Sequence, residues 1–192
     1  MFEKLKEVFH QYAFLHPKDL IQLASISKLI RLKKGAHLVK EGDLFYDAVG
    51  VVQGLLRHYI IDKNGDEKTL LFVREKNQTG MMDTIFHNRP ASENIMALEN
   101  TLLIKIDARK IEKLASDNMR LLKLQNEVLK QVVASNVEQI RFLTVLTPEE
   151  RYLAFCKSHP NLEQRVKQKH LASYLGITPT SLSRMRARLA KQ

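Results

Sequence analysis

The side chains whose types and spacing favour a recognisable chemistry lie in the last 29 residues, 164–192. This segment contains seven Lys or Arg residues and no Asp or Glu, which is most of the excess behind the formal net charge of +10. A run of like charge can be a solvated tail, but this one carries strong helical periodicity. We therefore expect a folded basic surface that binds a polyanion.

Residues 168–186 fit a helix-turn-helix motif. Ala172 is the small residue needed where two steeply crossing helices touch, and Gly176, four positions later, suits a turn with a positive φ. Thr178 is a good N-cap for the second helix and Pro179 a good first residue. A plain helical hairpin is the alternative, but several independent requirements are met at fixed spacing. The shared core of the two helices is expected to contain Leu171, Leu175, Ile177, Leu182 and Met185.

The second helix of this motif has one apolar face and one polar face. At 100° per residue, Leu182, Met185 and Leu189 share the side that must be buried. The opposite side carries hydroxyl and basic groups, a combination that suits the major groove of double-stranded DNA. The expected base contacts are Thr180, Ser183 and Arg184, and the expected phosphate contacts are Arg188 and Lys191.

Three further residues of the motif complete this prediction. Gln168 and Lys169, at the start of the first helix, are also predicted to contact DNA. Arg186 points to the flank of the second helix, where we expect a contact with the DNA backbone or with solvent.

The segment 26–106 must supply a different kind of element, because short apolar runs alternate there with turn signals. Residues 55–61 and 69–73 flank Asn64-Gly65, which is the strongest local signal of a β-hairpin. Regular short strands with such punctuation predict an antiparallel barrel or jelly roll. Two helices are expected before it, one over residues 2–14 and one that begins at Pro17.

Residues 117–146 contain no Gly or Pro and predict a helix about 45 Å long. Its apolar stripe is too long for a small barrel to cover, so we expect the helix to pair with a second copy of itself. The alternative is a helix packed wholly on its own domain. The stripe consists of Leu122, Leu129, Val132, Val133, Ile140 and Leu143, with one polar member, Asn136.

The segment Thr147-Pro148-Glu149-Glu150 is expected to end this helix and to begin the next one with a capping box. The single cysteine, Cys156, lies among apolar neighbours and is expected to be a buried structural thiol. We expect an α+β fold in three parts. They are a barrel domain with N-terminal helices at 1–116, a dimerisation helix at 117–146 and a helix-turn-helix domain at 147–192.

This order of elements resembles the catabolite-activator/Fnr (Crp/Fnr) family of bacterial transcription regulators. The resemblance covers the chain from about residue 20 onward. It is carried by Gly42, Gly54 and Gly65, by the long helix into Thr147-Pro148, and by residues 171–188. It implies a cyclic nucleotide-binding-like barrel and a guanine contact at Arg184. Proline at position 179 departs from the family pattern, so the family's best-known DNA sequence should not be assumed.

The resemblance also locates the place where family members hold a cyclic nucleotide, which is a cassette with a Gly-Glu pair followed by an Arg-Ser pair. Aligned on Ile85-Phe86, neither pair is present, and no arginine is available to neutralise the phosphate. We therefore expect no cyclic nucleotide and no cofactor, and the effector is unknown. The candidate effector-pocket residues are Met81, Met82, Asp83, Ser92 and Glu93, with Asn136 from the long helix.

The sequence contains no motif that indicates an enzyme, a metal site, a membrane span or a secreted protein. The composition, 44% hydrophobic and 27% charged, excludes general disorder. No metal-spaced cluster, phosphate-binding glycine loop or nucleophile elbow is present, so we expect no metal site and no enzyme. The seven histidines are interpreted as scattered surface residues. No apolar run reaches the roughly 20 residues of a membrane span, and no secretion signal is visible, so we expect a cytoplasmic protein.

We therefore expect a dimeric, sequence-specific DNA-binding regulator. Its partners would be double-stranded DNA and a second copy of the chain, with RNA polymerase as a further candidate. The alternative is a small-molecule sensor whose helix-turn-helix binds a protein partner. The one-sided basic charge of residues 164–192 favours DNA over that alternative.

Overall fold

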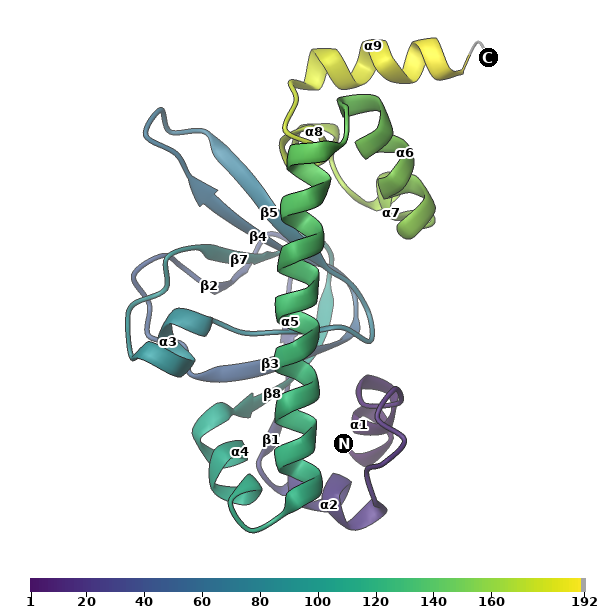
Figure 1. Cartoon of the computed structure of the whole chain (residues 1–192). Coiled ribbons are helices and arrows are strands. Elements are labelled where there is room, and N and C mark those ends of the chain that lie inside the picture. Colours follow the sequence, from purple (N-terminus) through teal and green to yellow (C-terminus); the bar gives the residue numbers. More distant parts are fainter. Residues whose placement is uncertain (191–192) are drawn as a thin grey trace. The chain divides into compact units, whose positions relative to one another are not determined.

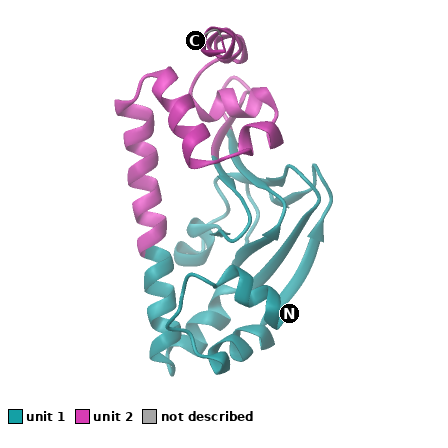
Figure 2. Cartoon of the chain, turned by 90° about the vertical axis from the view of Figure 1, so that its right-hand side faces the viewer, with its two compact units in different colours: residues 1–60, 71–129 teal, residues 61–70, 130–192 magenta. Residues whose placement is uncertain are grey.

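A computed structural model of the chain describes residues 1–190. These residues form two compact units (Figure 2). The first unit holds residues 1–60 and 71–129, and the second holds residues 61–70 together with the chain from Lys130 on. Among the described residues, no helix combines the length and the apolarity that crossing a bilayer requires.

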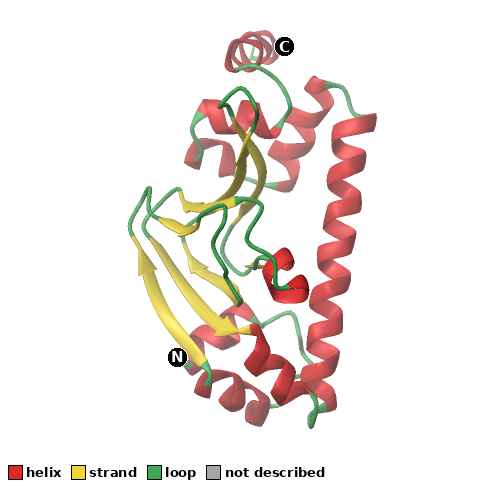
Figure 3. Ribbon diagram, turned by 90° about the vertical axis from the view of Figure 1, so that its left-hand side faces the viewer, coloured by secondary structure: helices red, strands yellow, loops and turns green. Residues whose placement is uncertain are grey.

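Two four-stranded sheets form the centre of the fold, with strand orders β1-β8-β3-β6 and β2-β7-β4-β5 (Figure 3). Neighbouring strands pair antiparallel, and the interleaved order is that of a jelly roll, which confirms the predicted fold class. The strands are β1 (Ser27–Leu32), β2 (His37–Val39), β3 (Asp47–Gln53), β4 (Leu56–Ile61), β5 (Glu67–Val73), β6 (Gln78–Thr79), β7 (Asn94–Ala97) and β8 (Thr101–Asp107).

The core of the jelly roll follows from the alternation of side chains along each strand. Val49 and Val51 of β3, Leu56 of β4 and Leu103 of β8 are all buried in one apolar cluster. Gly54, in the turn between β3 and β4, has a φ of +98°, and a Cβ there would lie 2.8 Å from the Cα of Thr101. A glycine is therefore required at this close approach of two chain segments.

Short helices close the first unit around a second apolar cluster. They are α1 (Phe2–Val8), α2 (Pro17–Ser25), α3 (Met82–His87) and α4 (Ala108–Ala115), followed by the long helix α5 (Met119–Val145) (Figure 1). Leu5 of α1, Leu23 of α2 and Leu121 of α5 are fully buried in this cluster. The expected helix over residues 2–14 was too long. The helix ends at Val8, because the chain turns so that the ring of Tyr12 packs between two other aromatic rings.

The junction between α2 and α5 depends on a buried carboxylate. Asp19 is 0% exposed. It accepts hydrogen bonds from Arg120 Nε at 2.6 Å, Asn118 Nδ2 at 2.8 Å and the backbone N–H of His16 at 2.7 Å. The hydrogen bond from Arg120 is the main reason that the pKa of Asp19 falls from 3.8 to about 2.

The second unit is helical apart from the tip of the β4–β5 hairpin. It contains the later part of α5 and then α6 (Pro148–Ser158), α7 (Leu162–Arg165), α8 (Gln168–Tyr174) and α9 (Pro179–Leu189). The predicted capping box at the start of α6 is confirmed. Thr147 Oγ1 accepts from the backbone N–H of Glu150, whose side chain accepts from the backbone N–H of Thr147. The latter bond lowers the pKa of Glu150.

Asp19→Asn should lower the free energy of unfolding by about 2 kcal/mol at neutral pH, because charged hydrogen bonds to a buried group are removed. The folded-state pKa is the lower one, so this contribution is present above about pH 4 and disappears as the pH falls through about 2. Urea unfolding of both proteins between pH 7 and pH 2 measures it. The exposed Asp117→Asn is the control, and a constant difference across this range would contradict the assignment.

Candidate nucleic-acid interface

Helices α8 and α9 form the helix-turn-helix that the spacing predicts. Leu171, Ala172 and Leu175 are fully buried, as the expected shared core requires. The backbone N–H of Ile177 donates to the carbonyl of Ala172 at 3.0 Å, and Gly176 has a φ of +69°. The turn therefore reverses the chain through a residue without a Cβ, which removes the steric cost of a positive φ.

The first turn of α9 is fixed by two side chains. Thr178 Oγ1 accepts from the backbone N–H of Ser181 at 3.1 Å, which confirms the predicted N-cap. Gln168 Nε2 donates to the carbonyl of Pro179 at 2.9 Å and so ties the start of α8 to the start of α9. Gln168 and Lys169 are exposed there, next to each other in the chain.

The two faces of α9 separate as the helical spacing predicts. Leu182 and Met185 are buried, whereas Leu189 is only partly covered. The side chains predicted to contact DNA are exposed: Thr180, Ser183, Arg184 and Arg188. Lys191, the last of that predicted set, lies outside the described residues.

The two arginines near the end of α9 have acidic partners within the second unit. Arg188 pairs with Glu149 at the surface, where an ion pair contributes about 1 kcal/mol at most and a phosphate can replace it. Arg186, which was expected to contact the DNA backbone or solvent on the flank of α9, has an acidic partner there. Its Nη2 lies 3.3 Å from Glu163 Oε2, and its side chain is half-buried, because α7 places a carboxylate on that flank of α9.

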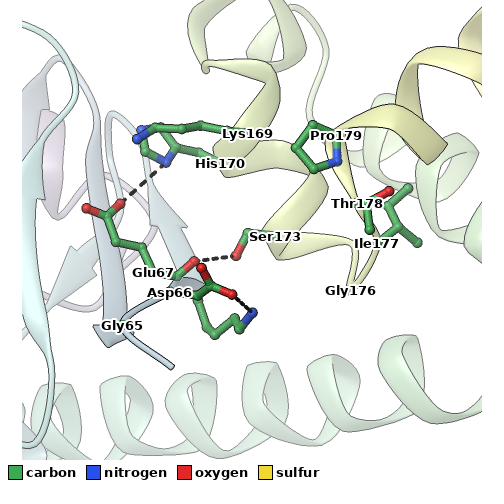
Figure 4. Close-up of a pocket in the computed structure, with 11 residues that line it drawn as sticks. Gly65, Asp66, Glu67, Lys169, His170, Ser173, Gly176, Ile177, Thr178 and Pro179 are labelled. Carbon is green, nitrogen blue, oxygen red and sulfur yellow. Dashed lines mark hydrogen bonds and ion pairs between the residues drawn. The ribbon is translucent and has the colours of Figure 1, made fainter. Parts of the chain in front are cut away.

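A cavity of about 790 Å³ lies between the tip of the β4–β5 hairpin and the helix-turn-helix (Figure 4). Ser173 Oγ accepts from the backbone N–H of Thr69 at 2.8 Å and donates to the carbonyl of Glu67 at 3.1 Å. The ring of His170 faces the carboxylate of Glu67 at 3.9 Å, as Figure 4 shows. The hairpin tip is therefore hydrogen-bonded to α8, and Lys169 shares the cavity with two carboxylates, those of Asp66 and Glu67.

The interpretation of all seven histidines as surface residues was wrong. His170 is 4% exposed and His58 is 3% exposed. In His58, Nδ1 lies 3.0 Å from Glu93 Oε1 and Nε2 lies 2.9 Å from Thr79 Oγ1. His58 lies in β4, where four consecutive residues from Leu56 to Tyr59 are buried, so the alternation of side chains along a strand gave no signal for its burial.

Three of the candidate effector-pocket residues are hydrogen-bonded within the first unit: Asp83, Ser92 and Glu93. Met81 is buried and precedes α3, which begins at Met82. Ser92 Oγ donates to Asp83 Oδ2 at 2.5 Å, while Glu93 is engaged by His58. Asn136 is exposed on α5, in the second unit. At the cassette position the chain thus presents a carboxylate, which repels a phosphate.

Known proteins resemble this chain in sequence. The family described as cyclic nucleotide-binding domain matches residues 29–118. The chain is 26% identical over 188 residues to the transcriptional activator protein Anr of Pseudomonas protegens, which covers 89% of this chain and 74% of that protein. It is 24% identical over 189 residues to electron transport regulator A of Shewanella oneidensis, which covers 92% and 75%.

A solved structure supports the same fold. FixK2 from Bradyrhizobium japonicum superposes with a TM-score of 0.75 at 16% identity, over 87% of this chain and 86% of that one. The fold is therefore shared with a protein whose sequence has diverged widely.

Cyclic AMP and cyclic GMP should bind this chain only above about millimolar concentration, because Glu93 faces the cassette position and no arginine neutralises the phosphate. Isothermal titration calorimetry with each nucleotide measures this. The variant with Ser92→Arg and Glu93→Ser restores the Arg-Ser pair, one of the two missing pairs, and should bind more tightly than the parent. A dissociation constant of the parent in the low micromolar range would overturn the prediction.

Proposed function

We propose that the chain is a transcription regulator of the Crp/Fnr type and acts as a homodimer whose two α9 helices read an inverted DNA repeat. The observation that carries this proposal is the exposed polar face of α9, held outward by the burial of Leu182 and Met185. A helix with this division, preceded by a tight turn and a second helix, is the element that enters the major groove.

The proposed DNA contact of each α9 residue depends on its distance from the start of the helix. Thr180, Ser183 and Arg184 lie in its first two turns and are the proposed base contacts. Arg184 can donate two parallel hydrogen bonds to O6 and N7 of a guanine. Arg188, with Gln168 and Lys169 at the start of α8, is proposed to contact phosphates, which position the protein without carrying sequence information.

The proposed dimer interface is the apolar stripe of α5. Val133 and Ile140 are each 62% exposed, and Val137 lies between them on the same face of the helix. A spacing of four and then three is that of a coiled-coil seam, which a second copy of the helix covers. Two-fold symmetry then gives two recognition helices for two half-sites about 34 Å apart.

The proposal extends to the effector, the protein partner and the cellular location of the chain. The effector of the jelly roll is proposed to be something other than a cyclic nucleotide, or to be absent. RNA polymerase is a proposed partner, since relatives named as transcriptional activators must act on transcription. A regulator of this kind is proposed to work in the cytoplasm, where the bacterial chromosome lies.

Ile140→Glu should convert the dimer into monomers, because two like charges would face each other across the seam. Light scattering at micromolar concentration measures the mass. Ser135→Glu is the matched control, because it adds the same charge at an exposed position on another side of α5. A monomeric parent protein would contradict the proposed dimer.

Arg184→Ala should weaken binding to a duplex selected by the parent protein from a random-sequence pool by about 1–3 kcal/mol. Binding to a scrambled duplex should change little. Arg188→Ala should weaken both duplexes alike and lower the salt slope by about one for each phosphate that the arginine neutralises. Isotherms at several salt concentrations test both. Equal losses of affinity for Arg184→Ala on the two duplexes would refute base reading, and failure of the parent to select any sequence would refute the proposed function.

A further inference from the structure

One carboxylate oxygen in the second unit receives three donors from two other helices. Glu163 lies on the short helix α7, and its Oε2 lies 2.7 Å from Tyr152 Oη and 3.4 Å from Cys156 Sγ, both on α6. The third donor is Arg186 Nη2 of α9, at 3.3 Å. Glu163 therefore connects the recognition helix to the two helices that precede the helix-turn-helix.

The two α6 donors keep their protons at neutral pH. Burial, with the hydrogen bond to Glu163, raises the pKa of Tyr152 to about 12. Burial also raises the pKa of the Cys156 thiol. Both groups therefore donate to the carboxylate, and the guanidinium of Arg186 also lies over the ring of Tyr152, 5.4 Å from its centroid.

We propose that Glu163 is a positioning residue for DNA recognition, which fixes the rotation of α9 about its own axis through Arg186. This inference rests on the proposed function, since it specifies what holds the base-reading face in register. Glu163 itself touches no DNA in this proposal, and Arg186 acts as its contact on α9 rather than as a phosphate ligand.

The need for such a contact follows from the nature of the other contacts of α9. The cap at Thr178 and the hydrogen bond from Gln168 to the carbonyl of Pro179 fix only the first turn of α9. Further along the helix, Leu182 and Met185 hold it by apolar burial, which is non-directional. A rotation of about 20° moves atoms about 6 Å from the helix axis by about 2 Å. Such a shift is enough to break a bidentate pair with a base, whose donor–acceptor distances tolerate only a few tenths of an ångström.

Arg186 is well placed to prevent this rotation. It lies two residues after Arg184, so the two side chains leave α9 about 200° apart. A directional ion pair on the Arg186 side therefore sets the direction of Arg184 without occupying the DNA-facing surface. Glu149 provides the contrast, because its partner Arg188 is 62% exposed and belongs to the face proposed to meet phosphates.

The experiment compares Glu163→Gln with Glu149→Gln. Each variant removes one negative charge next to α9, so each should strengthen binding to a scrambled duplex similarly. Only Glu163→Gln should reduce the ratio of affinities for the selected and scrambled duplexes, by about tenfold, because the amide of glutamine keeps the size of the side chain but cannot form the ion pair. Glu149→Gln should keep the ratio of the parent protein.

Arg186→Met provides a second route to the same answer if Glu163→Gln fails to fold. It should reduce the ratio to the same extent, and the double variant should reduce it no further than either single variant, since both act through one contact. The unfolding temperature of each variant is measured together with its binding isotherms. A packing role of Glu163 predicts a lower unfolding temperature and equal losses of affinity on both duplexes, whereas a positioning role predicts a lower ratio of the two affinities.

An unchanged ratio in both Glu163→Gln and Arg186→Met would overturn the proposal. Equal losses of affinity on both duplexes together with a lower unfolding temperature would also overturn it, because they would assign Glu163 to packing alone. In either case a parent protein that still selects a DNA sequence leaves the proposed function standing.

Discussion

Burial of the apolar side of α9 is the constraint on which the recognition surface depends. Leu182 and Met185 are buried where α9 packs in the second unit, and the contact of α9 with α8 is made possible by Ala172 at the crossing and Gly176 at the turn. Once that side is buried, helical geometry turns the residues between them outward. The polar face is thus a consequence of packing, and its chemistry is free to vary without cost to the fold.

Helix α5 meets two different demands along one continuous length. Near its start, Leu121 and Leu124 are buried in the apolar cluster of the first unit. In its later part, Val133, Val137 and Ile140 are exposed, although they are as apolar as the buried pair. A sequence stripe does not distinguish these cases, because periodicity reports which face is apolar and not what covers it. The exposed part is the surface on which an assembly of copies can depend.

The jelly roll combines an architecture that matches a known family with side-chain contacts of its own. The strand order is that of a jelly roll, and Glu93 and His58 satisfy each other near the cassette position. Hydrogen bonds to Glu93 and Thr79 satisfy both ring nitrogens of the buried His58 without a ligand. The family match over residues 29–118 therefore defines the architecture of this region rather than its effector.

The sequence by itself determined the features that depend on neighbours in the chain: the caps at Thr147 and Thr178, the turn at Gly176, and the two faces of α9. These rest on local hydrogen bonds and helical spacing, which a linear pattern records. Tertiary structure alone decided the partners of Arg186 and His58, which are 23 and 35 residues away in the chain. A charge pattern shows which groups need a partner, but only packing brings a particular carboxylate within hydrogen-bonding distance.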